Sequence, residues 1–141
     1  MKIILGSDER SPVVAHIATT LEMKGHEVRR LGTRAWGRAA VRVGEAVAKK
    51  EADIGIVCCF TGTGVAMAAN KVPGVRAALC VDAPTTKGAR KWNDANVLAL
   101  SLRLLTNTLA DEIIEAWLAT KYAGTEAESL GVIKELDRAR S

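Results

Sequence analysis

The segment Ile54-Gly55-Ile56-Val57-Cys58-Cys59-Phe60-Thr61-Gly62-Thr63-Gly64 carries the clearest structural pattern of the chain. Its first six residues are apolar on both faces of an extended chain, which is typical of a central parallel strand covered by helices on both sides. Two glycines follow, and Val65-Ala66-Met67-Ala68-Ala69 then continues with small and apolar residues suited to a helix. The sequence therefore predicts a buried strand, a tight turn and a helix in direct succession.

The same alternation of strands and helices extends in both directions from this stretch. A repeated βαβ pattern predicts an α/β fold whose sheet is parallel, with right-handed crossovers. We expect five strands, over Lys2–Leu5, Glu27–Leu31, Ile54–Cys59, Arg76–Cys80 and Val97–Leu100. Between and after them we expect helices over Pro12–Lys24, Arg38–Lys50, Gly64–Lys71, Ala83–Asn93 and Thr106–Thr120.

Length and composition predict one globular domain. The 141 residues match the usual size of a domain. Hydrophobic residues make up 48% and charged residues 26%, which argues against a disordered or fibrous chain. We expect a single domain over residues 1–141, with 126–141 as a polar, helical C-terminal tail. No apolar run approaches the roughly 18–20 residues of a membrane span, and no signal region precedes the first strand, so we expect a cytoplasmic protein.

Charge and cysteine content narrow the function further. The net charge is +4, but the basic residues are interleaved with acids and aromatics are only 4%. This pattern does not favour nucleic-acid binding, which needs basic patches and stacking side chains. A mild positive charge suits an enzyme for small anionic metabolites. The three cysteines are odd in number and lack metal-ligand spacing, so we expect no disulfide framework, no metal site and no cofactor.

The turn at Cys59–Gly64 holds the first candidate site, because ligands in such folds bind beyond the carboxyl ends of the strands. Its two glycines allow successive N–H groups to point into one concavity at a helix N-terminus. Such a nest suits a phosphate or the oxyanion of an enediolate. The alternative is an ordinary tight turn, since the loop lacks both the dinucleotide fingerprint and the phosphate-loop ending.

Cys59 is the candidate reactive group of this turn. It ends the strand against the helix N-terminus, a location that favours the thiolate. A thiolate there is placed to remove a carbon-bound proton while nearby N–H groups stabilise the oxyanion that results. The alternative is a buried structural cysteine, which is our interpretation of Cys58 and Cys80.

Several segments resemble the type B ribose-5-phosphate isomerase family, which also contains the galactose-6-phosphate isomerase subunits. They are Gly6-Ser7-Asp8, Gly25-His26-Glu27-Val28, the Cys59–Gly64 loop, the run Ala68–Cys80 and Asn93-Asp94-Ala95-Asn96-Val97-Leu98. The resemblance runs in register from Met1 to about Tyr122. It implies a three-layer α/β/α Rossmann-like domain that forms homodimers or homotetramers. It also implies a metal-free aldose–ketose isomerase whose active sites are shared between subunits.

The resemblance implies roles for individual residues. Cys59 corresponds to the catalytic base, and Thr61 to the hydroxyl residue that accompanies it. Asp8 corresponds to a group that holds substrate hydroxyls. Further substrate-binding positions are the anion-hole backbone of Phe60, Gly62, Thr63 and Gly64, together with Asn93 and Arg103 from the partner subunit, Arg103 at the phosphate end.

The sequence also departs from the family pattern. Glu9 stands where a histidine is usual, and it either binds substrate, assists proton transfer or faces water. Trp92 replaces the histidine that helps to open the sugar ring. Ala35-Trp36-Gly37 replaces an Asp-Tyr-Pro segment, and Gly124–Leu130 replaces an arginine-rich stretch that grips phosphate. Cations in or near the strand-end loops either compensate in part or are solvated surface charges: Arg10, Arg34, Arg38, Lys87 and Arg90.

Three functions remain open at this point. The first is an isomerase for a small sugar phosphate, either of the ribose 5-phosphate type or a shorter acyclic compound. The second is a catalytically weak subunit that needs a paralogue to complete its sites. The third is a non-catalytic sugar-phosphate binding protein. Retention of Cys59, Thr61 and the glycines favours the first.

Overall fold

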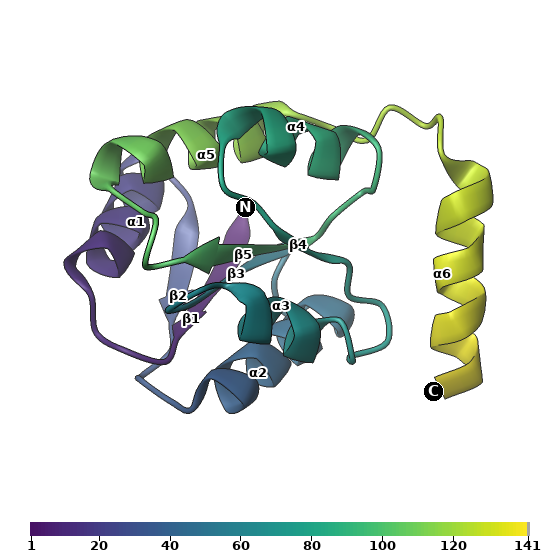
Figure 1. Cartoon of the computed structure of the whole chain (residues 1–141), viewed down its shortest axis with the longest axis horizontal. Coiled ribbons are helices and arrows are strands. Elements are labelled where there is room, and N and C mark those ends of the chain that lie inside the picture. Colours follow the sequence, from purple (N-terminus) through teal and green to yellow (C-terminus); the bar gives the residue numbers. More distant parts are fainter. Residues whose placement is uncertain (141) are drawn as a thin grey trace.

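A computed structural model describes residues 1–140 as a three-layer α/β structure followed by a separate C-terminal helix (Figure 1). The predicted three-layer α/β/α fold is confirmed, and Ser141, the last residue of the predicted tail, lies outside the described residues. The strands are β1 (Lys2–Ser7), β2 (Glu27–Arg30), β3 (Ile54–Cys59), β4 (Ala77–Leu79) and β5 (Val97–Ser101). The helices are α1 (Pro12–Met23), α2 (Trp36–Ala48), α3 (Thr63–Ala69), α4 (Ala83–Lys91), α5 (Asn107–Ala119) and α6 (Ala127–Arg140).

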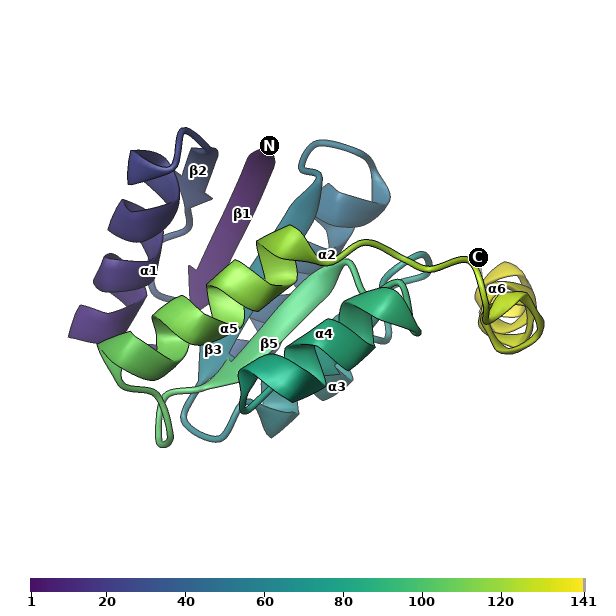
Figure 2. The ribbon, with the colours of Figure 1, turned by 90° about the horizontal axis from the view of Figure 1, so that it is seen from above.

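The five strands form one parallel sheet in the order β2-β1-β3-β5-β4. Helices α1, α4 and α5 cover one face of this sheet, and α2 and α3 cover the other (Figure 2). The central strand β3 is buried along its whole length, as its two apolar faces predict. The ends of the elements differ from the predicted ones by one or two residues.

Alternation along the strands divides the core in two. Ile56, Cys58 and Leu100 point to the face where Trp117 of α5 is buried. Val57 and Cys59 point to the other face, where they join Val43 of α2 and other side chains of that layer. Adjacent residues of a strand face opposite sides of a sheet, so the two neighbouring cysteines lie in different layers.

Helix α6 lies beside the main body rather than within it (Figure 2). Leu130 is its buried residue, and the Gly74 N–H donates a hydrogen bond to Asp137 Oδ2 at 3.0 Å. Its apolar side chains Val132, Ile133 and Leu136 are exposed. None of the helices among residues 1–140 is long and apolar enough to cross a membrane.

Gly55 provides a test of the packing between β3 and α2. An added Cβ there would lie 2.4 Å from Val43 Cγ1 and 3.2 Å from Val47 Cγ2. We expect Gly55→Ala to lower the free energy of unfolding by about 1–3 kcal/mol, the usual cost of overpacking a core. Urea denaturation measures this change. Gly131→Ala is the matched control, because its Cβ would meet open space; equal midpoints for the two variants would contradict the packing described.

Candidate active site

The loops after β1 and β3 lie side by side at the carboxyl ends of the strands, where the strand order reverses. From β1 the chain passes to β2 on one side, and β3 lies on the other side of β1. Ser7 pairs with Cys58, so the residues that follow, Asp8 and Cys59, emerge from neighbouring strands at the same edge. A crevice at the carboxyl ends of strands, where the strand order reverses, is the usual ligand site of such sheets.

Gly62 determines the shape of the loop after β3. Its φ is +78°, a left-handed conformation that side chains other than glycine rarely adopt. An added Cβ would also lie 2.6 Å from Leu79 Cδ1 and 2.9 Å from the Leu100 carbonyl carbon. The turn therefore requires glycine for both its conformation and its contact with β5. Beside it, the Oγ1 atoms of Thr61 and Thr63 share a hydrogen bond of 2.7 Å.

The segment after β5 holds the main chain of the same loop. The Leu102 N–H donates to the Cys59 carbonyl at 2.9 Å, and the Arg103 N–H donates to the Phe60 carbonyl at 2.8 Å. The Ser101 hydroxyl also donates to the Phe60 carbonyl, at 3.1 Å. Arg103 therefore lies beside the loop of its own chain, with an exposed side chain. Its role in a partner's site stays a prediction.

The three cysteines differ in their surroundings. Cys58 is completely buried, and burial raises the pKa of its thiol to about 12, assisted by the nearby Cys59 and Asp8. Burial also raises the pKa of Cys80, against the opposing effect of a hydrogen bond with Thr86. Both are therefore neutral thiols at physiological pH, as expected of structural cysteines. Cys59 is 5% exposed and ends its strand in the other layer, directly before the glycine-containing loop.

Asp8 and Glu9 extend the site from the end of β1. Asp8 is half-buried, and its Oδ1 atom is enclosed without a hydrogen-bond partner among the described residues. The Ser7 hydroxyl donates to the Glu9 carbonyl at 2.9 Å, which fixes the main chain here. The exposed Glu9 lines a separate cavity of about 380 Å³ with Arg10 on the α1 side. Asp8 thus holds an enclosed carboxylate oxygen whose capacity to accept a hydrogen bond is unused among the described residues.

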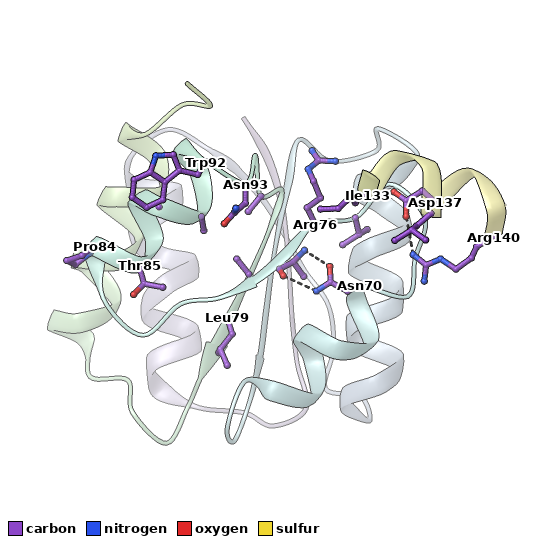
Figure 3. A pocket seen from close by; sticks show the side chains of 17 residues that line it. Asn70, Arg76, Leu79, Pro84, Thr85, Trp92, Asn93, Ile133, Asp137 and Arg140 are labelled. Carbon is purple, nitrogen blue, oxygen red and sulfur yellow. Dashed lines mark hydrogen bonds and ion pairs between the residues drawn. The ribbon is translucent and has the colours of Figure 1, made fainter. Parts of the chain in front are cut away.

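Asn93 and Trp92 lie toward the amino ends of the strands, whereas Cys59 of the same chain lies at the carboxyl ends. They follow α4, whose direction is antiparallel to that of the strands, and they line a cavity of about 720 Å³ between α4, β4 and α6 (Figure 3). The Trp92 ring packs on Gly88, where an added Cβ would lie 2.9 Å from it. One chain alone therefore does not bring these two residues to its own Cys59.

The structure reveals one wall of the site that the sequence did not indicate. The indole of Trp36, at the start of α2, packs over Gly64, and an added Cβ on Gly64 would lie 3.0 Å from the ring. This ring is half exposed. The sequence marked Trp36 as unusual, because it lies in the segment that replaces Asp-Tyr-Pro. The sequence did not indicate its contact with Gly64, because the two residues belong to segments far apart in the chain.

Arg90 is corrected from a candidate phosphate ligand to a structural residue. Its Nη1 donates to the Ala95 carbonyl at 2.6 Å, and its guanidinium lies 4.8 Å from the centre of the Trp117 ring. Burial lowers the pKa of this guanidinium. The side chain is therefore occupied between α4 and α5.

The described residues contain no cluster of metal-binding side chains, and both histidines lie outside the loops at the carboxyl ends of the strands. Within residues 1–140, no three His, Cys, Asp or Glu side chains lie close enough together to hold a metal ion. His16 Nε2 lies 2.7 Å from Asp111 Oδ1 between α1 and α5. His26 Nδ1 lies 3.0 Å from the Met1 amino group, near the amino ends of the strands. Neither histidine therefore takes the place of the one replaced by Trp92.

Comparisons with known proteins agree with this geometry. A family model described as Ribose/Galactose Isomerase matches residues 3–133. The chain is 38% identical to the galactose-6-phosphate isomerase subunit LacB of Clostridium acetobutylicum, over 97% of this chain and 82% of that one. It is 49% identical to a D-erythrulose-4-phosphate isomerase of Pectobacterium atrosepticum over a shorter segment, 50% of this chain and 46% of that one.

A solved structure extends the likeness to the whole fold. The ribose-5-phosphate isomerase B of Clostridium thermocellum is 38% identical, and the superposition covers 100% of each chain with a TM-score of 0.95. The likeness therefore covers the whole chain, from the strands to the C-terminal helix. The chain belongs to the ribose/galactose isomerase family.

Proposed function

We propose that this chain is an aldose–ketose isomerase of a small sugar phosphate, with Cys59 as the base. The observation that carries this is the position of Cys59 at the strand-order reversal, where the glycine-constrained loop and Asp8 meet it. Membership of the isomerase family supports the class of reaction. A binding protein without catalysis has no need of a thiol at that point.

The proposed reaction moves one proton between adjacent carbons. The Cys59 thiolate takes the proton from the carbon next to the carbonyl, and the electron pair of that C–H bond forms the enediolate. N–H groups of the Phe60–Gly64 loop stabilise the negative oxygen. The hydroxyl proton of the carbon that lost its hydrogen passes to the former carbonyl oxygen, which becomes the new hydroxyl. The thiol then returns the carbon-bound proton to the neighbouring carbon, so that the new carbonyl forms at the other carbon and the thiolate is restored. Asp8 Oδ1 accepts a hydrogen bond from a substrate hydroxyl, and the Thr61 hydroxyl assists beside the base.

Two copies of the chain are needed for this site as we propose it. Within one chain, Asn93 lies at the end of the sheet away from Cys59, and the resemblance assigns it to the site of the partner subunit. Strand β4 is an edge of the sheet, and such an edge is usually covered. Beside it, exposed apolar residues of α6 face the 720 Å³ cavity that also contains Trp92 and Asn93 (Figure 3). A second copy that covers this region forms a homodimer, and two such dimers form a tetramer.

We further propose that the preferred substrate is acyclic. Trp92 stands where the family has its ring-opening histidine, and an indole N–H is a donor of negligible acidity. A four-carbon sugar phosphorylated at its terminal carbon cannot close a five-membered ring, so it needs no ring-opening acid. The relative named D-erythrulose-4-phosphate isomerase supports a substrate of this length.

The choice of substrate tests this proposal. We expect wild-type protein to have a higher kcat/KM for erythrulose 4-phosphate than for ribose 5-phosphate. Trp92→His should raise kcat/KM for the cyclic substrate relative to the acyclic one, because it restores a group able to protonate the ring oxygen. A strong wild-type preference for ribose 5-phosphate would defeat the acyclic-substrate proposal and direct attention to Glu9 as the ring-opening acid.

Mixing two inactive variants tests the shared site. Cys59→Ser removes the base of a chain, and Asn93→Ala removes the group that the chain lends to its partner. Co-expressed in equal amounts, the variants should recover about a quarter of wild-type activity, because half of the random dimers are mixed and each holds one intact site. The control is each variant alone. An active monomer by light scattering, or a mixture as inactive as its parents, would exclude the shared site.

A further inference from the structure

The proposed substrate carries a phosphate, but the segment that grips phosphate in the resembling family has no arginine in this chain. Gly124–Leu130 contains neither arginine nor lysine. We propose that Arg34 and Arg38 bind the phosphate of the substrate from the same chain as Cys59, with Trp36 as the wall between phosphate and base. This proposal rests on the proposed function and names the phosphate ligands of that site.

The first support is the place of the segment. The Arg34 N–H donates to the Ser7 carbonyl at 3.4 Å, so the chain before α2 runs along the end of β1, directly before Asp8. Two residues later, the Trp36 ring covers Gly64 of the loop after β3. The segment from Arg34 to Arg38 therefore contacts both the end of β1 and the loop after β3.

The second support is that Cys59 and helix α2 lie on the same face of the sheet. Cys59 points to the layer of α2 and α3, and Arg38 lies exposed in the first turn of α2. Of the other candidate cations, Arg10 lines the cavity on the α1 side, and Lys87 belongs to α4 on the opposite layer. Arg103 lies beside the same loop, and the resemblance assigns it to the partner's site. Arg34 and Arg38 share the α2 layer with the base of their own chain.

The third support is that no acidic side chain neutralises Arg34 or Arg38. A groove of about 800 Å³ along α2 is lined by Arg34, Trp36 and Arg38 and contains a single acidic residue, Glu45. Arg42 in the same groove lies 3.4 Å from Glu51, but across residues 1–140 neither Arg34 nor Arg38 forms an ion pair. Two unpaired guanidinium groups beside an aromatic ring suit a phosphate, which accepts paired N–H bonds from arginine.

The start of α2 adds to this arrangement. Its N-cap residue is Ala35, which provides no side-chain hydrogen bond to the first turn. The free N–H groups of that turn and the helix dipole both favour an anion there. The groups that favour an anion are thus the two guanidinium groups and this helix start.

Binding to non-reacting protein is the direct test. In a Cys59→Ser background, calorimetry would measure the Kd for erythrulose 4-phosphate and for unphosphorylated erythrulose. Arg34→Gln and Arg38→Gln should each weaken binding of the phosphorylated sugar by about ten- to a hundredfold, the usual loss for a hydrogen bond to a charged group. Neither variant should change the affinity for erythrulose. With Cys59 restored, the same variants should raise KM while kcat changes little, and Arg→Lys should recover part of the affinity.

The control is Arg42→Gln, which removes a cation of the same groove that is already paired; its Kd should stay within about twofold of the parent. Unchanged affinity in both Arg34→Gln and Arg38→Gln, with melting temperatures like the parent, would overturn the proposal. Failure of the proposed function looks different. In that case the wild-type protein binds the phosphorylated sugar through Arg34 and Arg38 but exchanges no proton of it with solvent.

Discussion

The contact of Gly62 with the main chain of Leu100 is the constraint on which the site depends. It exists because β5 pairs directly with β3 and carries its backbone past the turn that follows Cys59. The absence of a Cβ at Gly62 lets the turn close against β5. The N–H groups of Leu102 and Arg103, directly after β5, then donate hydrogen bonds to the Cys59 and Phe60 carbonyls. The thiol, the loop and the helix after it are thereby fixed relative to the sheet.

The fold also separates Cys59 from Asn93 within one chain. Cys59, Asp8 and the loop lie at the carboxyl ends of the strands, whereas Trp92 and Asn93 follow α4, which runs back toward the other end of the sheet. This separation is the reason for proposing a site shared between two chains. The exposed side chains of Ile133 and Leu136 in α6 line the same cavity as Trp92 and Asn93, beside the edge strand β4.

The parts that follow from local pattern could be predicted from the sequence. The apolar run of β3 indicated a central strand, and alternation placed Cys58 and Cys59 in different layers. The contact of Trp36 with Gly64 could not be predicted, because it depends on how two distant loops pack together. Arg90 was misjudged for the same reason: a surface position in the sequence becomes a half-buried contact with Trp117 only when α4 and α5 are side by side.

Two tryptophans that depart from the family pattern, Trp92 and Trp36, lie at opposite ends of the strands. In the proposed reaction Trp92 provides no group to open a ring, and the ring of Trp36, between Arg34 and Arg38, packs on Gly64 of the loop that follows Cys59. Both changes are consistent with a shorter substrate, because such a substrate needs no ring opening and brings its phosphate closer to the reacting carbons. The loss of the arginines near the C-terminus then has a physical explanation.

The most direct measurement of the central claim is proton exchange followed by NMR in D₂O. Wild-type protein and Cys58→Ser should both incorporate solvent deuterium into erythrulose 4-phosphate at the carbon next to the carbonyl. Cys59→Ser should fold normally and lose the exchange by at least about 10²–10⁴-fold, the contribution of a general base. Equal losses in the two folded variants, or exchange that persists in Cys59→Ser, would contradict the assignment of Cys59 as the base.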